Sequence, residues 1–160
     1  ISELWNLGYV HRDIKPGNII KTSIPTRPFV LLDLGIAYSI NEASLTFRPG
    51  SRIMATYRYL APELIRPDFR ENIDYRSDLY TTALTIYEYS SQKHPIAHNY
   101  EDDVQTISRA LRDIPISLKN YRPDLSDGFC ELINQMLKKS PHLRPANINS
   151  LIKRYEGEIQ

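Results

Sequence analysis

The sequence predicts a mainly α-helical α+β fold, in which one helical body carries a small β-hairpin at one edge. Three observations support this prediction. Two short apolar segments near the start are separated by a turn, a long stretch without hydrophobic periodicity follows, and the second half repeats apolar residues at intervals of three and four. The length of 160 residues fits one domain.

The N-terminal part has the pattern of a helix end followed by a hairpin. Residues 2–10 include Trp5 and other apolar side chains that can face inward, and Gly8 marks the end of this helix. Segments 18–22 and 28–32 are rich in Ile, Val, Leu and Phe, and the link between them contains proline. Together they predict two short antiparallel strands.

A long loop and then helices are expected in the remainder. Residues 37–54 have no steady period and predict a loop, and long loops in compact domains are often functional. We expect the first helix after it to begin near Asp78, and Ser126 to cap a later one. The apolar positions of the four predicted helices are Leu79, Ala83, Ile86 and Tyr87; Val104, Ile107 and Leu111; Phe129, Leu132, Ile133, Met136 and Leu137; and Ile148, Leu151, Ile152 and Tyr155.

The composition argues against several classes of protein. With 41% hydrophobic and 24% charged residues, the chain resembles an ordinary globular protein, and a net charge of +1 predicts neither nucleic-acid nor membrane-surface binding. The single cysteine, Cys130, excludes an internal disulfide framework and favours an intracellular, cytoplasmic location, where we expect an inert buried thiol. No membrane span or signal peptide is predicted.

Four polar residues near the hairpin carry the chemistry. Residues 11–18 read HRDIKPGN, and the carboxylate of Asp33 follows fifteen residues after Asn18. The carboxylate of Asp13 can orient and deprotonate an attacking hydroxyl, and the ammonium of Lys15 can bind a phosphate oxygen. Asn18 and Asp33 offer the oxygen ligands that Mg²⁺ prefers. Any one of these residues is as typical of a turn, so the spacing of the set carries the prediction of phosphoryl transfer from a nucleotide.

These motifs resemble the catalytic loop and the metal-binding loop of eukaryotic-type protein kinases. Residues 61–63, Ala-Pro-Glu, resemble the motif that closes the kinase activation segment, and residues 141–145 resemble a late motif whose arginine pairs with that glutamate. The resemblance implies a buried Arg144–Glu63 ion pair. It also implies that Asp78 binds the backbone of the His11–Arg12 turn.

The resemblance further implies a protein serine/threonine kinase that uses ATP and Mg²⁺ on a protein substrate. Lys15 followed by proline is typical of Ser/Thr-specific members. Thr56 matches the threonine that braces Asp13 and Lys15 in them. Ile20 matches the residue that forms the floor under adenine, although it also fits a plain core strand residue. ATP contacts are thus expected at Lys15, Asn18, Ile20 and Asp33, and metal contacts at Asn18 and Asp33.

By this resemblance, residues 1–160 form a partial protein kinase domain, its C-terminal lobe. The catalytic loop would span 11–18, the activation segment 33–63 and a helical subdomain 76–157. We expect the N-terminal lobe to lie upstream in a longer protein and to be a partner of this chain, in addition to the protein substrate. No G-x-G-x-x-G motif and no strand-borne lysine precede the catalytic loop, and the first residue is not methionine.

Two other functions are compatible with parts of the sequence. The first is a catalytically silent, truncated kinase lobe that acts as a binding or regulatory module. This function would explain why the G-x-G-x-x-G segment, which covers the nucleotide in kinases, is missing. A small-molecule phosphotransferase of kinase-like fold is disfavoured by Glu63 and Arg144. His94 and His98 have metal-ligand spacing, but Pro95 between them argues against a metal site.

The residues beside Asp13 have expected roles of their own. His11 is predicted to be a packed histidine that anchors the loop, and not an acid or base. The guanidinium of Arg12 suits a phosphate placed on the 37–54 loop, and equally an ordinary ion pair.

Overall fold

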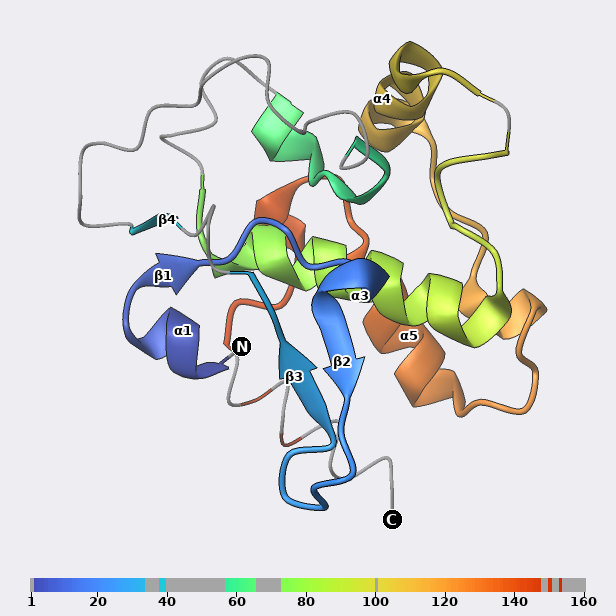
Figure 1. The fold of residues 1–160 in the computed structure, drawn as a ribbon. Helices are drawn as coiled ribbons and strands as arrows, with labels where there is room; N and C mark the ends of the chain where they lie inside the picture. The colour runs from blue at the N-terminus through green and yellow to red at the C-terminus, as the bar shows by residue number, and fades with distance from the viewer. Residues whose placement is uncertain are drawn as a thin grey trace.

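The computed structural model describes residues 2–33, 38–39, 57–65, 73–99, 101–147, 150 and 153. This part of the chain contains α-helices, short 3₁₀ segments and two small antiparallel sheets (Figure 1). The α-helices are α1 (Ser2–Asn6), α3 (Tyr75–Ser91), α4 (Asp103–Arg112) and α5 (Asp127–Met136). The strands are β1 (Tyr9–Val10), β2 (Ile19–Lys21), β3 (Phe29–Leu31) and β4 (Tyr38–Ser39). The 3₁₀ segments are η1 (Pro16–Asn18), η2 (Tyr57–Tyr59), η3 (Pro62–Ile65), η4 (Leu118–Asn120) and η5 (Pro141–Leu143).

The predicted hairpin is confirmed. Strands β2 and β3 pair antiparallel with Ile20 opposite Val30, and the N–H of Leu32 donates to the carbonyl of Asn18 at 2.7 Å, which extends the pairing by one step. A second pair, β1 with β4, was not predicted, because strands of two residues carry no sequence pattern. Gly8, at φ 78°, allows the chain to turn from α1 into β1.

Helix α3 lies at the centre of the described structure and begins earlier than expected. It starts at Tyr75 instead of near Asp78, because the side chain of Asp74 accepts the N–H of Arg76 at 2.7 Å and caps the helix. The apolar repeat, which starts only at Leu79, could not indicate this first turn. Buried residues occur on every side of α3, as expected for a helix surrounded by other elements.

Helices α4 and α5 both form where the sequence predicted them, but they differ in burial. In α5, Ser126 accepts the N–H of Phe129 at 3.1 Å, which confirms the predicted cap. Most of the stripe predicted for α5 is buried in the core, to which it contributes Leu132, Ile133, Met136 and Leu137, whereas Phe129 is partly buried. In α4 the buried residues are Thr106 and Ala110, whereas Val104 is 74% exposed. Its small side chains are therefore buried more completely than its larger apolar ones, among which Ile107 is half-buried.

The hydrophobic core lies between α3 and α5 (Figure 1). The last predicted helix, 148–155, and the predicted loop, 37–54, lie mostly outside the described residues. In the described ranges, no helix has the length and hydrophobicity needed to cross a bilayer.

Candidate active site

A buried carboxylate on α3 holds the loop that follows β1. The side chain of Asp78 accepts the backbone N–H of His11 on Oδ2 and that of Arg12 on Oδ1, both at 2.8 Å. The indole N–H of Trp5 donates to the same Oδ2 at 2.9 Å. Burial raises the pKa of the Asp78 carboxyl, and these N–H donors act in the opposite direction. The predicted anchoring of the His11–Arg12 turn by Asp78 is confirmed.

His11 connects this loop to the end of the hairpin. Its side chain is completely buried. Its Nδ1 accepts the N–H of Asp13 at 3.3 Å, and its Nε2 lies 3.1 Å from the carbonyl oxygen of Leu32. One accepted and one donated bond fit a neutral imidazole with its proton on Nε2. The predicted anchoring role of His11 is therefore confirmed.

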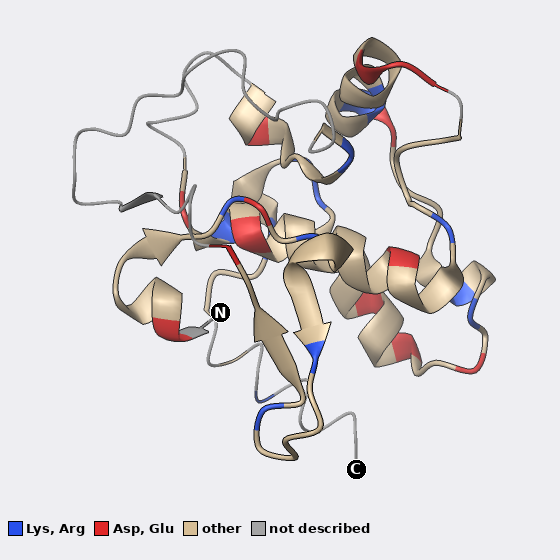
Figure 2. Ribbon diagram, viewed as in Figure 1, with Lys and Arg blue, Asp and Glu red and all other residues tan. Residues whose placement is uncertain are grey.

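Three of the four predicted polar side chains meet directly beside this anchor. The Nζ of Lys15 lies 2.9 and 2.8 Å from the two carboxylate oxygens of Asp13. The Nδ2 of Asn18 donates to the backbone carbonyl and to Oδ2 of Asp13, both at 2.8 Å. Pro16 begins η1, and this turn brings Asn18 back towards Asp13. Figure 2 shows basic and acidic residues next to each other along this loop.

Asp33 reaches the same edge of the molecule from the other strand. It lies two positions after the end of β3, and the Leu32–Asn18 backbone bond places the end of β3 beside the end of η1. The Asp33 side chain is exposed. Asp33 and Arg12 both have left-handed backbones, with φ of 62° and 67°. Such conformations cost about 1–3 kcal/mol each in non-glycine residues and are concentrated at functional sites.

The remaining predicted site residues have different outcomes. Ile20 is 49% exposed, so its interpretation as a plain core strand residue is wrong. Thr56 lies outside the described residues, as does most of the activation segment predicted for 33–63.

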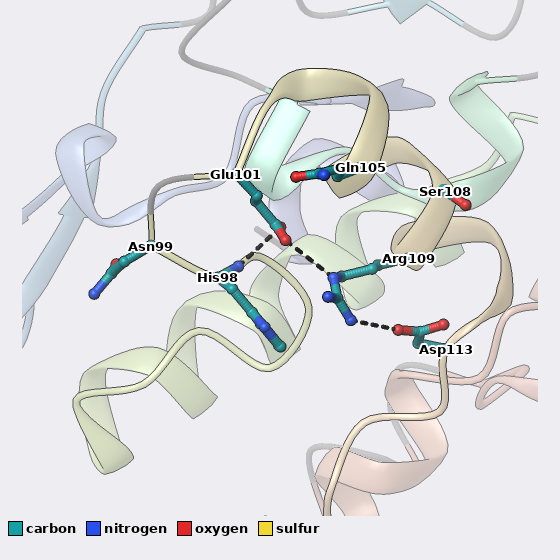
Figure 3. A pocket seen from close by; sticks show the side chains of 7 residues that line it. All are labelled: His98, Asn99, Glu101, Gln105, Ser108, Arg109 and Asp113. Carbon is teal, nitrogen blue, oxygen red and sulfur yellow. Dashed lines mark hydrogen bonds and ion pairs between the residues drawn. The ribbon is translucent and has the colours of Figure 1, made fainter.

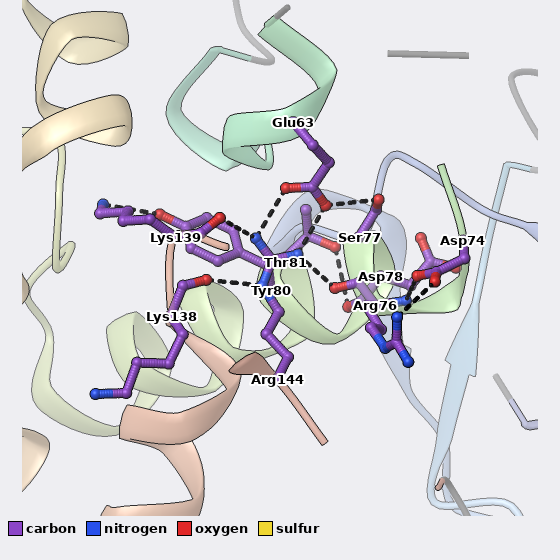
Figure 4. Close-up of polar contacts among 10 residues, drawn as sticks. All are labelled: Glu63, Asp74, Arg76, Ser77, Asp78, Tyr80, Thr81, Lys138, Lys139 and Arg144. Carbon is purple, nitrogen blue, oxygen red and sulfur yellow. Dashed lines mark hydrogen bonds and ion pairs between the residues drawn. The ribbon is translucent and has the colours of Figure 1, made fainter. Parts of the chain in front are cut away.

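The predicted Arg144–Glu63 ion pair is confirmed (Figure 4). Two guanidinium nitrogens of Arg144 bind the two carboxylate oxygens of Glu63, at 2.7 and 2.8 Å. The other donors of Arg144 reach the carbonyls of residues 76, 138 and 139, so all five N–H groups are used. Ser77 adds a hydrogen bond to Glu63 at 2.7 Å. The pair joins η3 to α3 and to the segment after α5.

The two histidines with metal-ligand spacing do not form a metal site. The Nδ1 of His94 accepts the backbone N–H groups of Ile96 and Ala97, at 3.1 and 2.7 Å. Burial lowers the pKa of His94 to about 3, whereas His98 is exposed. Among the described residues, no group of three His, Cys, Asp or Glu side chains is placed to hold a metal. Burial also raises the pKa of the Cys130 thiol, as expected for an unreactive cysteine.

A shallow surface depression beside α4 was not predicted (Figure 3). Arg109 on its wall is paired with Glu101 at 3.0 Å and with Asp113 at 2.9 Å, so its charge is compensated. None of the residues 11–18 lines this depression. The polar cluster around Asp13 is therefore the better candidate for chemistry.

The contact that sequence reasoning missed is the bond from Trp5 to Asp78. The sequence assigned Trp5 to packing, and the two residues are separated by 73 positions. No spacing rule relates residues so far apart.

Comparison with known proteins identifies the family of this chain. The family model "Protein kinase domain" matches residues 1–155, and the chain belongs to this family. A probable serine/threonine-protein kinase of Streptomyces coelicolor is 28% identical over 137 residues, which is 86% of this chain and 19% of that protein. The serine/threonine-protein kinase PknA of Mycobacterium tuberculosis is 35% identical over 137 residues, 86% of this chain and 29% of that protein. The chain thus spans less than a third of the length of these relatives.

A solved structure has the same fold. The twitchin kinase region from C. elegans matches with a TM-score of 0.72 and 21% identity, over 92% of this chain and 24% of that one. The mainly helical fold with a small β-hairpin is therefore a protein-kinase-like fold, as the sequence predicted.

Proposed function

We propose that this chain is the catalytic-loop part of a protein serine/threonine kinase, which transfers the γ-phosphate of ATP to Ser or Thr hydroxyls of a protein. The observation that carries this proposal is the contact of Lys15 and Asn18 with the carboxylate of Asp13. The names of the relatives, which are serine/threonine-protein kinases, support the same reaction.

Each side chain has a proposed task in the transfer. The Asp13 carboxylate accepts a hydrogen bond from the substrate hydroxyl and orients it towards the γ-phosphorus. It takes the hydroxyl proton as the new P–O bond forms and the bond from the γ-phosphorus to the β–γ bridging oxygen breaks, so that ADP leaves. The ammonium of Lys15 moves from Asp13 to a γ-phosphate oxygen when ATP binds, which frees the carboxylate for the hydroxyl. Thr56 is proposed to brace these two residues.

The donor set fits a magnesium ion. Asn18 uses its Nδ2 on Asp13, and no described residue donates to its Oδ1, so this oxygen is available as a ligand. Asp33 offers an exposed carboxylate at the same edge. Both are the hard oxygen ligands that Mg²⁺ prefers. When bound, Mg²⁺ would neutralise charge on the phosphates.

The nucleotide also needs contacts on its other side, and we propose that an upstream N-terminal lobe of the full-length protein provides them. Ile20 would then lie beneath the adenine. Ile20, Val30 and Leu32, which the strand register places on one face of the hairpin, are 49, 36 and 39% exposed, which is a large exposure for adjacent apolar side chains. This apolar surface is where the upstream lobe would pack.

The same exposed apolar hairpin favours the second candidate function. A lobe that never receives a nucleotide lid would act as a non-catalytic binding or regulatory module. Its hairpin would then bind a protein partner.

The substitution Asp13→Asn in the full-length protein tests the proposal. We expect kcat for phosphorylation of a general protein substrate to fall by about 10²–10⁴-fold, because proton transfer and hydroxyl orientation are lost. The thermal midpoint and the KM for ATP should stay close to the wild-type values. Asp124→Asn, on the exposed surface, is the matched control. Unchanged transfer by Asp13→Asn would overturn the assignment, and a wild-type protein that transfers no phosphate would favour the binding module.

A further inference from the structure

Trp5 is the only tryptophan of the chain, and its indole N–H is part of the polar contacts beneath the catalytic loop. It donates to Oδ2 of Asp78 at 2.9 Å, and this oxygen also accepts the N–H of His11 at 2.8 Å. Trp5 comes from α1 and Asp78 from α3, so the bond joins the helix that precedes the loop to the helix that binds its backbone.

The carboxylate of Asp78 depends on its donors. It is completely buried, and its donors Trp5, His11 and Arg12 are neutral N–H groups. A buried carboxylate without enough donors is costly, so the loss of one donor favours protonation or rotation of the group. The upward shift that burial produces in the pKa of Asp78 agrees with this reasoning.

The backbone that Asp78 holds is strained. Arg12 has φ of 67°, and such a conformation persists only where the surroundings over-determine it. The next residue is Asp13, whose N–H donates to His11. A change in how Asp78 binds the backbone of His11 and Arg12 therefore directly affects the position of Asp13, the proposed base.

The orientation of the indole is itself fixed. The Trp5 ring lies 5.6 Å from the ring of Tyr75 at an interplanar angle of 47°, and the Tyr75 hydroxyl donates to the carbonyl of Ala146. Tyr75 is the first residue of α3. The N–H of Trp5 is thus aimed at Asp78 by contacts with the same helix.

We propose that Trp5 is a positioning residue for phosphoryl transfer, whose indole N–H acts through Asp78 to fix the His11–Arg12 turn and so the carboxylate of Asp13. This inference rests on the proposed function for its effect on catalysis, but its effect on the loop can be measured separately. The competing interpretation is that Trp5 only packs against Tyr75 and the core.

Two substitutions separate these interpretations. Trp5→Phe keeps an aromatic ring against Tyr75 and removes the N–H. Trp5→His loses the benzo ring but keeps a donor, because Nε2 of histidine lies two bonds from Cγ, as does Nε1 of tryptophan. A role through the N–H predicts that Trp5→His resembles the wild type, whereas a packing role predicts that Trp5→Phe does.

The first readout is amide hydrogen exchange in the full-length protein, which needs no activity. We expect the amides of His11 and Arg12 to exchange about tenfold faster or more in Trp5→Phe, because a hydrogen bond to a charged group is lost, and at nearly wild-type rates in Trp5→His. In the wild type, the indole N–H should exchange as slowly as these two amides. An indole that exchanges much faster than these amides overturns the proposal without any substitution.

The second readout is steady-state kinetics. We expect Trp5→Phe to lower kcat by about 10–100-fold through misplacement of Asp13, with the KM for ATP unchanged, and Trp5→His to recover most of this loss. Equal losses in both variants, or none in Trp5→Phe, would overturn the proposal. If the wild type transfers no phosphate, the proposed function fails, while the exchange rates still decide whether Trp5 holds the loop.

Discussion

Two of the clusters in which a carboxylate meets a cation, Arg144–Glu63 and Lys15–Asp13, differ in how completely their donors and acceptors are used. The Arg144 and Glu63 side chains are 0% and 4% exposed, and every N–H of the guanidinium has a protein acceptor. The Lys15 and Asp13 side chains are 22% and 9% exposed. Within the described residues, the ammonium of Lys15 contacts only the carboxylate of Asp13.

This difference separates a structural pair from the pair to which we assign the proposed chemistry. A saturated, buried pair has no capacity left for a ligand and fixes the geometry of the elements that it joins. A partly exposed pair can exchange partners at small cost, because water and ligand oxygens can replace either member. The two clusters thus contain similar chemical groups but are suited to opposite tasks.

The largest effect is expected at the buried pair. Glu63→Gln leaves the Arg144 guanidinium buried without a counter-charge, and we expect the free energy of unfolding to fall by about 3–5 kcal/mol. Urea denaturation measures this change. Lys119→Ala is the control, because its partner Asp127 is 91% exposed and we expect a much smaller loss of stability there.

A double-mutant cycle sharpens this test. Glu63→Gln combined with Arg144→Met should lose less than the sum of the two single changes, because no unpaired charge stays buried. Strictly additive losses of unfolding free energy would contradict the conclusion that Glu63 and Arg144 stabilise the fold as a pair.

His94 shows how burial changes the pKa of a titratable group. Burial is the largest cause of the shift, the charge of Arg58 acts in the same direction, and the charge of Glu101 opposes it. The pKa of His94 falls from 6.5 to about 3 through burial, so between these values the unfolded chain binds a proton that the folded chain does not. Above pH 6.5 the protonation of His94 therefore does not lower the free energy of unfolding. Below this pH the free energy of unfolding decreases by up to about 1.4 kcal/mol per pH unit, because the unfolded chain binds the additional proton. Urea unfolding at a series of pH values measures this slope.

A substitution by asparagine distinguishes the effect of protonation from the effect of the hydrogen bonds that His94 accepts. His94→Asn keeps an acceptor for the N–H groups of residues 96 and 97 but takes up no proton, so the slope should become shallower. His98→Asn, at an exposed site, should leave the slope unchanged. An equal slope in His94→Asn and wild type would show that burial of His94 has no part in acid sensitivity.

The smallest effect on stability is expected at the Lys15–Asp13 pair. Lys15→Met should lower the free energy of unfolding by about 1 kcal/mol or less, because the pair is partly exposed and Asn18 still donates to Asp13. Urea denaturation of Lys15→Met beside Arg144→Met provides the direct comparison. Similar losses of unfolding free energy in the two variants would contradict the distinction between the buried Arg144–Glu63 pair and the partly exposed Lys15–Asp13 pair.

The sequence by itself determined the features that depend on short spacing. The loop from Asp13 to Asn18 closes through five residues and one proline-led turn, so its polar groups could be predicted to meet. The β2–β3 hairpin and the Ser126 cap are equally local. The Arg144–Glu63 pair is long-range, and it could be predicted only because two motifs of a known family carry it.

Only the tertiary structure decided the features that depend on which surfaces meet. The apolar repeat of α4 could not show that Thr106 and Ala110 face the body, and the composition of the hairpin could not show that Ile20 is exposed. The bond from Trp5 to Asp78 exists because α1 packs against the start of α3. The physical reason is that backbone geometry fixes neighbours along the chain, whereas contacts between distant segments depend on how whole elements pack together.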